Sequence, residues 1–399
     1  MKKHLAAYLV VLLTIVGFLV VADGVSAKVV KARRWRPAAE AVDKASQQPK
    51  AYLVMEATTG KVLEEQNMHE KRAPASMTKL MVAYIVLDRI AKGENHLTDM
   101  VRTSAVASHM GGSRVYLKEG EEFSLEDMMK ALMIASANDA AYAIGEFISG
   151  TREDFVDLMN EKAKALGMND TEFHSPHGLP PDKGQKEDLT SCFDMAILAR
   201  ELLKYPKVIE WSSTKTADFR NGTFILNNHN KLLSRMPEVD GLKTGYYRET
   251  GYNVTVTAKK GDLRFIEVVM GSPTWKARDE FAVEKLKRFF AEFIAVNVAK
   301  KGEPVGEEVY LSDGKYRKIK GVAAADVSIP VLRDRKKDIK RVVNLPRAVK
   351  GEVKEGQKLG EIVFQLDNEV VGKVDVVSPQ YVPKANFFTR MVRKTGLNL

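Results

Sequence analysis

The sequence predicts an α+β fold, with helices packed on an antiparallel sheet, followed by a small all-β domain. Two hairpin patterns, at residues 51–67 and 251–272, enclose a long stretch with helical periodicity. Strands at both ends of a helical stretch indicate one layered domain, which we expect over residues 49–301. From about residue 302 the chain consists of short valine-rich runs without helical periodicity, which predict the all-β domain over residues 302–378.

The elements of the first domain follow from local signals. The first hairpin turns at Thr59-Gly60 and the second at Gly261-Asp262. Residues 174–188 contain three prolines and two glycines and are expected to form a loop. Helices are expected wherever apolar residues recur at helical spacing, which occurs from Ser76 to residue 90 and over 124–136, 151–168, 189–205 and 277–295. Ser124 is the expected N-cap of the second helix, and Gly167 is expected to stop the third.

The N-terminus predicts export. Lys2 and Lys3 precede an uncharged run over residues 5–22, and Val25-Ser26-Ala27 then offers a small-residue cleavage site. We therefore expect a signal peptide over residues 1–27, a basic linker over 28–48, and a periplasmic or cell-envelope location. Because the apolar run is longer than the core of a usual signal peptide, an uncleaved anchor remains an alternative.

Composition excludes several classes of function. The formal net charge of +10 is spread over segments of mixed sign, and no basic stripe is interleaved with aromatic residues, so nucleic acid is not an expected partner. Cys192 is the single cysteine, and the H-x-x-H of His174 and His177 is interrupted by Pro176. We therefore expect neither a metal site nor a cofactor, and we expect Cys192 to be packed and inert.

One pair of residues is unusual for the helix in which it lies. S-x-x-K occurs at Ser76, Ser212 and Ser312, but only Ser76 opens an otherwise apolar helix. There, Ser76 and Lys79 would lie one helical turn apart in a partly dry site. A desolvated lysine loses its proton more readily, and a neutral amine can accept the proton of a serine hydroxyl. The pattern therefore predicts a nucleophilic serine with a lysine base.

Two further motifs accompany this pair. S-x-N occurs once, as Ser136-Ala137-Asn138, at the end of a predicted helix. K-T-G occurs as Lys243-Thr244-Gly245, leading into a predicted strand pair, where a glycine allows another backbone or a substrate to approach closely. A second K-T-G at 394–396 has no strand on which to lie.

The three motifs in this order resemble those of the penicilloyl serine transferases, the penicillin-binding proteins and serine β-lactamases. The segments "GGSRVYLKEGEEFSLEDMMKALMIASANDAA", "HGL", "DGLKTGYYRETGYNVTVTA" and "SPTWKARDEF" are similar to the low-molecular-mass D-alanyl-D-alanine carboxypeptidases, and the similarity spans about residues 45–300. The resemblance implies a penicillin-binding transpeptidase-like fold, periplasmic action, acylation by β-lactams and removal of the terminal D-alanine from peptidoglycan stem pentapeptides.

The resemblance also implies roles for the motif residues. Ser76 would attack the D-Ala-D-Ala carbonyl, and Lys79 would accept its proton. Lys243 would favour the neutral form of Lys79 by repulsion. Ser136 would relay a proton to the leaving D-alanine, and Asn138 would hold the substrate amide or orient Lys79.

Four further residues would bind the substrate. The backbone N–H groups of Ser76 and Tyr246 would stabilise the oxyanion, although some relatives carry histidine at the position of Tyr246. Thr244 and Arg278 would bind the terminal carboxylate, and Gly245 would permit its close approach.

Three other functions remain as alternatives. An endopeptidase that cuts D-alanyl cross-links uses the same chemistry, and the sequence does not separate it from a carboxypeptidase. A serine β-lactamase of class A would need a glutamate between the second and third motifs, for which Glu172 is the candidate, but no asparagine follows at the required spacing. A non-catalytic wall-binding protein would be expected to have a broken motif, and none is broken.

The C-terminal tail, residues 379–399, predicts an amphipathic helix. Phe387, Phe388, Met391 and Val392 fall on one arc of a helical wheel, whereas the basic residues Arg390, Arg393 and Lys394 fall on the other. We expect this segment to lie at the anionic surface of the inner membrane, with docking of the tail on its own domain as the alternative.

Overall fold

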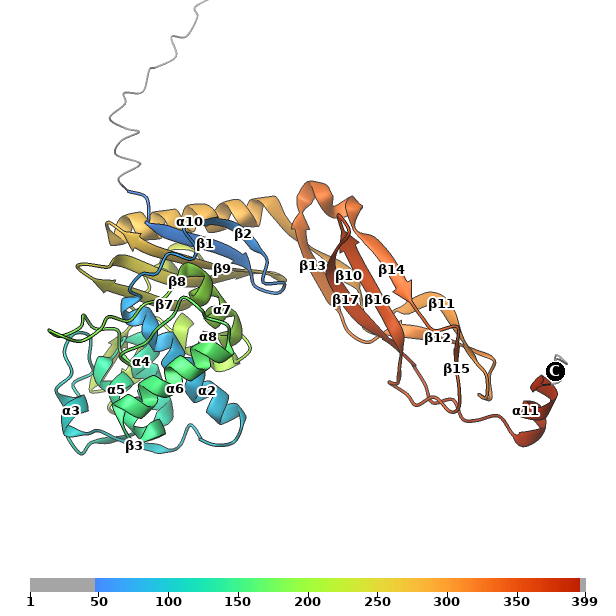
Figure 1. The fold of residues 1–399 in the computed structure, drawn as a ribbon, viewed down its shortest axis with the longest axis horizontal. Coiled ribbons are helices and arrows are strands. Elements are labelled where there is room, and N and C mark those ends of the chain that lie inside the picture. Colours follow the sequence, from blue (N-terminus) through green and yellow to red (C-terminus); the bar gives the residue numbers. More distant parts are fainter. Residues whose placement is uncertain (1–46, 395–399) are drawn as a thin grey trace, which may run out of the picture. The chain divides into compact units, whose positions relative to one another are not determined.

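The computed structural model describes residues 47–394 (Figure 1). The expected signal peptide, residues 28–46 of the linker and residues 395–399 lie outside the described residues. The first domain is built on a five-stranded antiparallel sheet in the order β2-β1-β9-β8-β7. Its strands are β1 (Ala51–Glu56), β2 (Val62–Gln66), β7 (Val239–Tyr247), β8 (Gly251–Lys260) and β9 (Leu263–Ser272). The two predicted hairpins are therefore confirmed and form one sheet.

Both faces of this sheet are covered. Alternate residues of β9 point to opposite sides, so that Ile266 and Val268 join one apolar cluster while Phe265 and Val269 join another. Helix α10 (Trp275–Glu292) packs on the second face, whereas α2 (Lys79–Ala91) and α7 (Cys192–Leu202) contribute to the core on the first (Figure 1). This layering confirms the predicted α+β fold.

The remaining helices and short strands lie between β2 and β7 in the chain. Their bounds are η1 (Ala75–Thr78), α3 (Ala105–Ser108), α4 (Leu125–Ile134), α5 (Asn138–Ser149), α6 (Arg152–Ala165), α8 (Pro206–Ser213), α9 (Leu232–Arg235), β3 (Met100–Arg102), β4 (Glu122–Ser124), β5 (Thr216–Phe219) and β6 (Phe224–Asn227). Strands β3 and β4 form a separate antiparallel pair, as do β5 and β6. Residues 174–188 contain neither a helix nor a strand, as the prolines and glycines predict.

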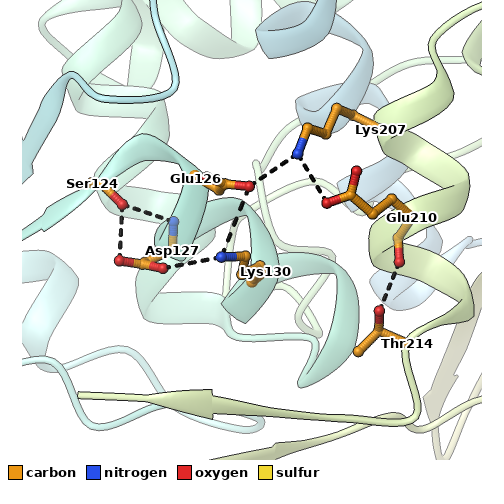
Figure 2. Close-up of polar contacts among 7 residues, drawn as sticks. All are labelled: Ser124, Glu126, Asp127, Lys130, Lys207, Glu210 and Thr214. Atoms are coloured by element: carbon orange, nitrogen blue, oxygen red, sulfur yellow. Dashed lines mark hydrogen bonds and ion pairs between the residues drawn. The ribbon is translucent and has the colours of Figure 1, made fainter. Parts of the chain in front are cut away.

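The start of α4 shows how local signals anchor an element of the site. Ser124 Oγ accepts a hydrogen bond from the Asp127 N–H at 3.1 Å and donates to Asp127 Oδ2 at 2.9 Å, which makes Ser124 the predicted N-cap. Lys207 of α8 binds Glu126 Oε1 at 3.1 Å and Glu210 Oε1 at 2.9 Å, as Figure 2 shows. These contacts hold the helix whose last turn leads directly into Ser136.

Two helix boundaries differ from the sequence prediction. The first helix was expected to begin at Ser76, but the chain forms a 3-10 turn over Ala75–Thr78, and the α-helix starts at Lys79. The last helix was expected to reach residue 295, but α10 ends at Glu292. The residues that follow instead form β10 (Phe293–Ala299), because their apolar and β-branched side chains pair with β13.

The C-terminal part is rich in strands, as predicted. It comprises β11 (Pro304–Leu311), β12 (Lys318–Ala323), β13 (Val327–Leu332), η2 (Arg333–Asp338), β14 (Lys340–Asn344), β15 (Ala348–Val349), β16 (Lys358–Leu366), β17 (Glu369–Val377) and the terminal helix α11 (Phe387–Lys394). Strand β10 pairs with β13, and a six-stranded sheet has the order β14-β16-β17-β12-β11-β15. Strand pairing of the β-rich part thus begins at Phe293, ahead of residue 302. Among the described helices, none is both long and apolar enough to cross a bilayer.

Candidate active site

The serine and lysine of the S-x-x-K motif are in direct contact. Ser76 is half-buried in η1, and Lys79, the first residue of α2, has no exposed surface. The Nζ atom of Lys79 lies 3.0 Å from Ser76 Oγ and donates a second hydrogen bond to the carbonyl oxygen of His177 at 2.7 Å. The tight turn, in which Ala75 adopts a φ of +50°, directs the Ser76 side chain toward the buried amine.

Two glycines hold this turn. A Cβ atom on Gly245 would lie 2.3 Å from the carbonyl oxygen of Pro74, and one on Gly178 would lie 2.0 Å from that of Ala75. Gly178 also has a φ of +74°, which favours glycine. The glycine of K-T-G is therefore required by the close approach of another backbone, which is one of the two reasons the sequence suggested.

The second serine and the second lysine are also in contact. Lys243 of β7 donates from Nζ to Ser136 Oγ at 2.9 Å and to the carbonyl oxygen of Thr244 at 3.2 Å. Ser136 is buried between α4 and α5 and has a φ of +59°, an uncommon conformation for a residue other than glycine. The chain therefore bends sharply at Ser136 to bring its hydroxyl to Lys243.

Burial and mutual repulsion set the protonation of the two lysines. Burial lowers the pKa of Lys79 well below that of a free lysine, and the positive charge of Lys243 lowers it further, whereas Asp188 and Asp139 raise it. Burial, followed by repulsion from Arg278, lowers the pKa of Lys243 to about 7. Burial and repulsion therefore shift both amines toward the neutral form, which is the form that accepts a proton from a hydroxyl.

Asn138 has one amide atom without a hydrogen-bond partner among the described residues. Its Nδ2 donates to the carbonyl oxygen of Gly111 at 2.7 Å, and its backbone N–H donates to the carbonyl oxygen of Ser113 at 2.7 Å. Its Oδ1 is buried and, within residues 47–394, has no hydrogen-bond partner. Among these residues Asn138 makes no hydrogen bond to Lys79, so Oδ1 is available to another donor.

The motif residues surround a pocket of about 310 Å³. Its lining combines residues from all three motifs with residues from later segments, namely Ser76, Ser113, Ser136, His229, Lys231, Thr244, Gly245, Tyr246, Tyr252, Trp275 and Arg278. The lining includes all four residues that the sequence predicts to bind the substrate, namely Thr244, Gly245, Tyr246 and Arg278. Lys79, Lys243 and Asn138 adjoin it from behind, through the contacts described above.

Sequence reasoning missed several residues of this pocket. Ser113, His229, Lys231, Tyr252 and Trp275 belong to no motif and come from loops or from the ends of elements, so no local pattern indicates them. Tyr252 stacks on Tyr246, with ring centroids 4.1 Å apart.

The environment of Arg278 fixes its guanidinium. Arg278 is 4% exposed, and its Nε and Nη2 donate to Asp279 Oδ1 at 2.9 and 2.6 Å. Its Nη1 donates to the carbonyl oxygen of Asn253 at 3.3 Å. A guanidinium held in this way at the pocket wall offers charge and planar geometry to a carboxylate.

His177, to which the sequence analysis assigns no catalytic role, is a structural partner of the site. Its carbonyl oxygen binds Lys79, and burial lowers the pKa of its imidazole to about 3, so the ring is neutral. The ring faces a separate pocket of about 520 Å³ that contains no residue of the three motifs. That larger pocket therefore contains neither the Ser76–Lys79 pair nor the Ser136–Lys243 pair.

Other residues singled out from the sequence lie away from the pocket. Glu172 is half-exposed and binds His174 and Lys186, and it does not line the pocket that contains Ser76. Cys192 is fully buried, as expected, and burial raises the pKa of its thiol. Within the described part of the chain, no group of three or more His, Cys, Asp or Glu side chains is arranged to hold a metal ion.

A family model described as D-alanyl-D-alanine carboxypeptidase matches residues 38–274, which contain all three motifs. The chain belongs to this family. A second model, described as the C-terminal domain of penicillin-binding protein 5, matches residues 293–384. The resemblance inferred from the motifs is thus confirmed, together with the transpeptidase-like domain and the β-rich domain that follows it. This carboxypeptidase is a serine-type enzyme of the low-molecular-mass penicillin-binding proteins.

Individual relatives agree with this assignment. The carboxypeptidase is 37% identical to D-alanyl-D-alanine carboxypeptidase DacF of Bacillus subtilis, over 87% of this chain and 89% of the relative. It is 33% identical to DacA of Escherichia coli, over 86% and 85% of the two chains. Among solved structures, penicillin-binding protein 5 of Haemophilus influenzae is 29% identical, with a TM-score of 0.68 over 84% of this chain and 98% of that one.

A relative has been solved with an antibiotic. The structure of penicillin-binding protein D2 of Listeria monocytogenes, in its ampicillin-bound form, is 32% identical, with a TM-score of 0.54 over 60% of this chain and 96% of that one.

Proposed function

We propose that this carboxypeptidase removes the terminal D-alanine from peptidoglycan stem pentapeptides through an acyl-enzyme on Ser76. The observation that carries the proposal is the 3.0 Å contact between Ser76 Oγ and a fully buried Lys79 amine. A neutral Lys79 accepts the hydroxyl proton as Ser76 attacks the carbonyl carbon of the D-Ala-D-Ala bond. Backbone N–H groups of Ser76 and Tyr246 stabilise the oxyanion that forms.

Proton delivery to the leaving group belongs to the second serine. Ser136 Oγ donates its proton to the nitrogen of the departing D-alanine and is reprotonated through Lys243, to which it is hydrogen-bonded at 2.9 Å. The pKa of Lys243, about 7, suits a group that gains and loses a proton near neutral pH. The proton that Lys79 took from Ser76 replaces the one that Ser136 and Lys243 delivered, so Lys79 is neutral again. Lys79 then accepts a proton from the water that attacks the acyl carbon and returns it to Ser76 Oγ as the shortened peptide leaves.

Substrate orientation comes from Thr244 and Arg278 in the pocket lining and from the side chain of Asn138. Thr244 and Arg278 bind the terminal carboxylate, because a hydroxyl and a fixed guanidinium line the pocket there. Gly245 keeps that wall close to the turn before Ser76. The unpartnered Oδ1 of Asn138 accepts a hydrogen bond from an amide N–H of the substrate.

We further propose that β-lactams acylate Ser76, as their binding to a relative suggests. The test is intact mass over time after addition of benzylpenicillin to the full chain, to Ser76→Ala and to Ser312→Ala, which alters an unrelated S-x-x-K serine. A long-lived adduct on the native protein and on Ser312→Ala, absent from Ser76→Ala, is expected. An adduct that appears and vanishes within seconds while the drug is consumed would favour a β-lactamase.

The same protein preparation separates carboxypeptidase from endopeptidase. D-Alanine released from a stem pentapeptide is measured beside the cleavage of a D-alanyl cross-linked peptide dimer. Release of D-alanine at the higher kcat/KM is expected. Cleavage of the dimer at an equal or higher value would replace the carboxypeptidase proposal with the endopeptidase alternative.

We also propose that the protein is exported and that α11 binds the anionic outer surface of the cytoplasmic membrane. The support is a helix that exposes Phe387 by 72%, Phe388 by 74% and Met391 by 51%, beside basic Arg390. Sedimentation of the full chain with vesicles of anionic lipid is expected. It should weaken in Phe387→Ser/Phe388→Ser but not in Tyr381→Ser, which removes an exposed ring upstream. Equal binding by both variants would contradict a role for α11.

A further inference from the structure

A second pocket adjoins the active-site pocket and is lined by three cationic side chains. It measures about 370 Å³, and we call it the cationic pocket. Its lining consists of Lys215, Asn227, Asn228, Asn230, Lys231, Ser234 and Arg235. Lys231 also lines the pocket that contains Ser76, so the two pockets meet at this side chain.

The lining of the cationic pocket contains cations, amides and a hydroxyl, but no carboxylate. In the described part of the chain, neither Lys215 nor Lys231 has an acidic side chain within ion-pair distance. Arg235 lies 3.9 Å from Asp279 Oδ2, but the other oxygen of that carboxylate is bound to Arg278. The lining therefore has an excess of positive charge, which suits an anionic group.

Contacts with the aromatic ring of Trp275 show where the cationic pocket lies relative to the active-site pocket. Lys231 Nζ is 4.7 Å from the ring centroid, and the Arg235 guanidinium carbon is 5.2 Å from it. Trp275 and Arg278 both line the active-site pocket, and Asp279 lies between the Arg278 and Arg235 guanidinium groups. The cationic pocket is thus on the Arg278 side of the active-site pocket, where the proposed function puts the terminal carboxylate.

We infer that the cationic pocket is a subsite for a second anionic group carried by the residue that the enzyme releases. The inference rests on the proposed function, because it takes Thr244 and Arg278 as the binding groups for the terminal carboxylate. D-Alanine has no second anion and leaves the pocket unfilled. A D-amino acid with an acidic side chain places its second carboxylate beyond Arg278, within reach of Lys231 and then Lys215.

The subsite changes specificity and not the chemistry. The same amide bond is cleaved by the same acyl transfer to Ser76, and only the identity of the leaving amine differs. A half-exposed ion pair of this kind contributes roughly a fivefold preference for the acidic residue, which corresponds to about 1 kcal/mol. Because exposed charges are screened, the preference should fall as salt rises.

The test compares peptides that differ only in the released residue. The full chain is given diacetyl-L-Lys-D-Ala-D-Xaa in which the last residue is D-alanine, D-glutamate or D-glutamine, and kcat/KM is measured for each. D-Glutamine matches the shape of D-glutamate without its side-chain charge, so the ratio of these two isolates the anion. We expect a ratio of about five in the native enzyme at low salt.

Two charge reversals complete the test. Lys215→Glu is expected to bring the ratio to about one or below while leaving D-alanine release unchanged, because Lys215 does not line the active-site pocket. Lys260→Glu makes the same change in net charge on an exposed residue at the far end of β8 and should leave the ratio near five. A ratio near one in the native enzyme, or an equal fall in both variants, would overturn the inference while D-alanine release upholds the proposed function. If the native enzyme releases no D-alanine, both are overturned.

Discussion

The buried carboxylate of Asp279 is expected to act on the substrate through Arg278. Asp279 has no exposed surface, and its Oδ1 accepts two hydrogen bonds from the Arg278 guanidinium. Among the described residues, the Arg278 side chain makes one further hydrogen bond, to the carbonyl oxygen of Asn253 at 3.3 Å, which is a long contact. Changing Asp279→Asn removes the charge but keeps one acceptor oxygen, so it tests how much the position of Arg278 depends on that charge.

The expected magnitude follows from these contacts. Hydrogen bonds to charged groups contribute about 1.5–3 kcal/mol each, and breaking a buried ion pair costs about 3–5 kcal/mol. Because asparagine retains one acceptor, we expect the free energy of unfolding to fall by about 2–3 kcal/mol. A less firmly held guanidinium binds the terminal carboxylate more weakly, so kcat/KM should fall by about 10-fold to 100-fold, mainly through KM.

The assay uses two peptides that differ at one end. A D-Ala-D-Ala peptide with a free carboxylate is compared with the same peptide carrying a C-terminal amide, and Asp279→Glu serves as the conservative variant. The loss should be confined to the carboxylate peptide and partly restored by Asp279→Glu. In the Arg278→Ala background, Asp279→Asn should cost little more, because the two residues act together. Equal losses for both peptides, or a further tenfold loss in the double variant, would refute the reasoning.

Three other predictions concern the lysines, the sheet and the turn at Ser76. Lys243→Met removes a positive charge that lowers the pKa of Lys79. The rate of acylation by penicillin should therefore fall at least about 100-fold, and the pH at which this rate increases should move higher, because Lys79 then loses its proton at higher pH. Acylation rates measured across a range of pH test both expectations. Glu267 is fully buried with neither oxygen bonded in the described chain, and burial raises its pKa. The free energy of unfolding therefore falls as pH rises above about 4.3, where the carboxyl of the unfolded chain ionises. Glu267→Met should raise the free energy of unfolding, measured in urea, by about 1–3 kcal/mol at pH 8 but by little at pH 4. An equal increase at both pH values would contradict this. Gly178→Ala would force a Cβ atom onto the carbonyl of Ala75. The substitution should therefore lower the free energy of unfolding by at least about 2 kcal/mol and slow the acylation of Ser76. Unchanged acylation would show that the turn tolerates the clash.

The sequence predicted what local patterns determine. The hairpins, the cap at Ser124 and the proline-rich loop all depend on residues near one another in the chain, and each is present in the structure. The S-x-x-K motif was separated from its two duplicates by the apolar helix that follows Ser76. That distinction was physical, because burial of Lys79 is what changes the chemistry of the pair.

Contacts between distant segments could not be predicted in this way. The carbonyl of His177 binds Lys79 from a loop far along the chain, and the turn at Ala75 packs against glycines that are distant in the sequence. His229 and Trp275 reach the pocket from segments with no motif. The last helix was predicted to extend beyond Glu292 for the same reason, because the strand that begins at Phe293 depends on pairing with the distant β13.

The sheet topology explains why the K-T-G motif lies where it does. Strand β7 is at the edge of the five-stranded sheet, and Thr244, Gly245 and Tyr246 on it line the pocket. Extended peptides bind to edge strands through backbone hydrogen bonds, which position a scissile bond without recognising every side chain. The other edge, β2, is far from the serines because three strands separate it from β7. In the proposed binding mode, specificity is then left to the groups that would meet the end of the peptide, which are Arg278 and the cationic pocket.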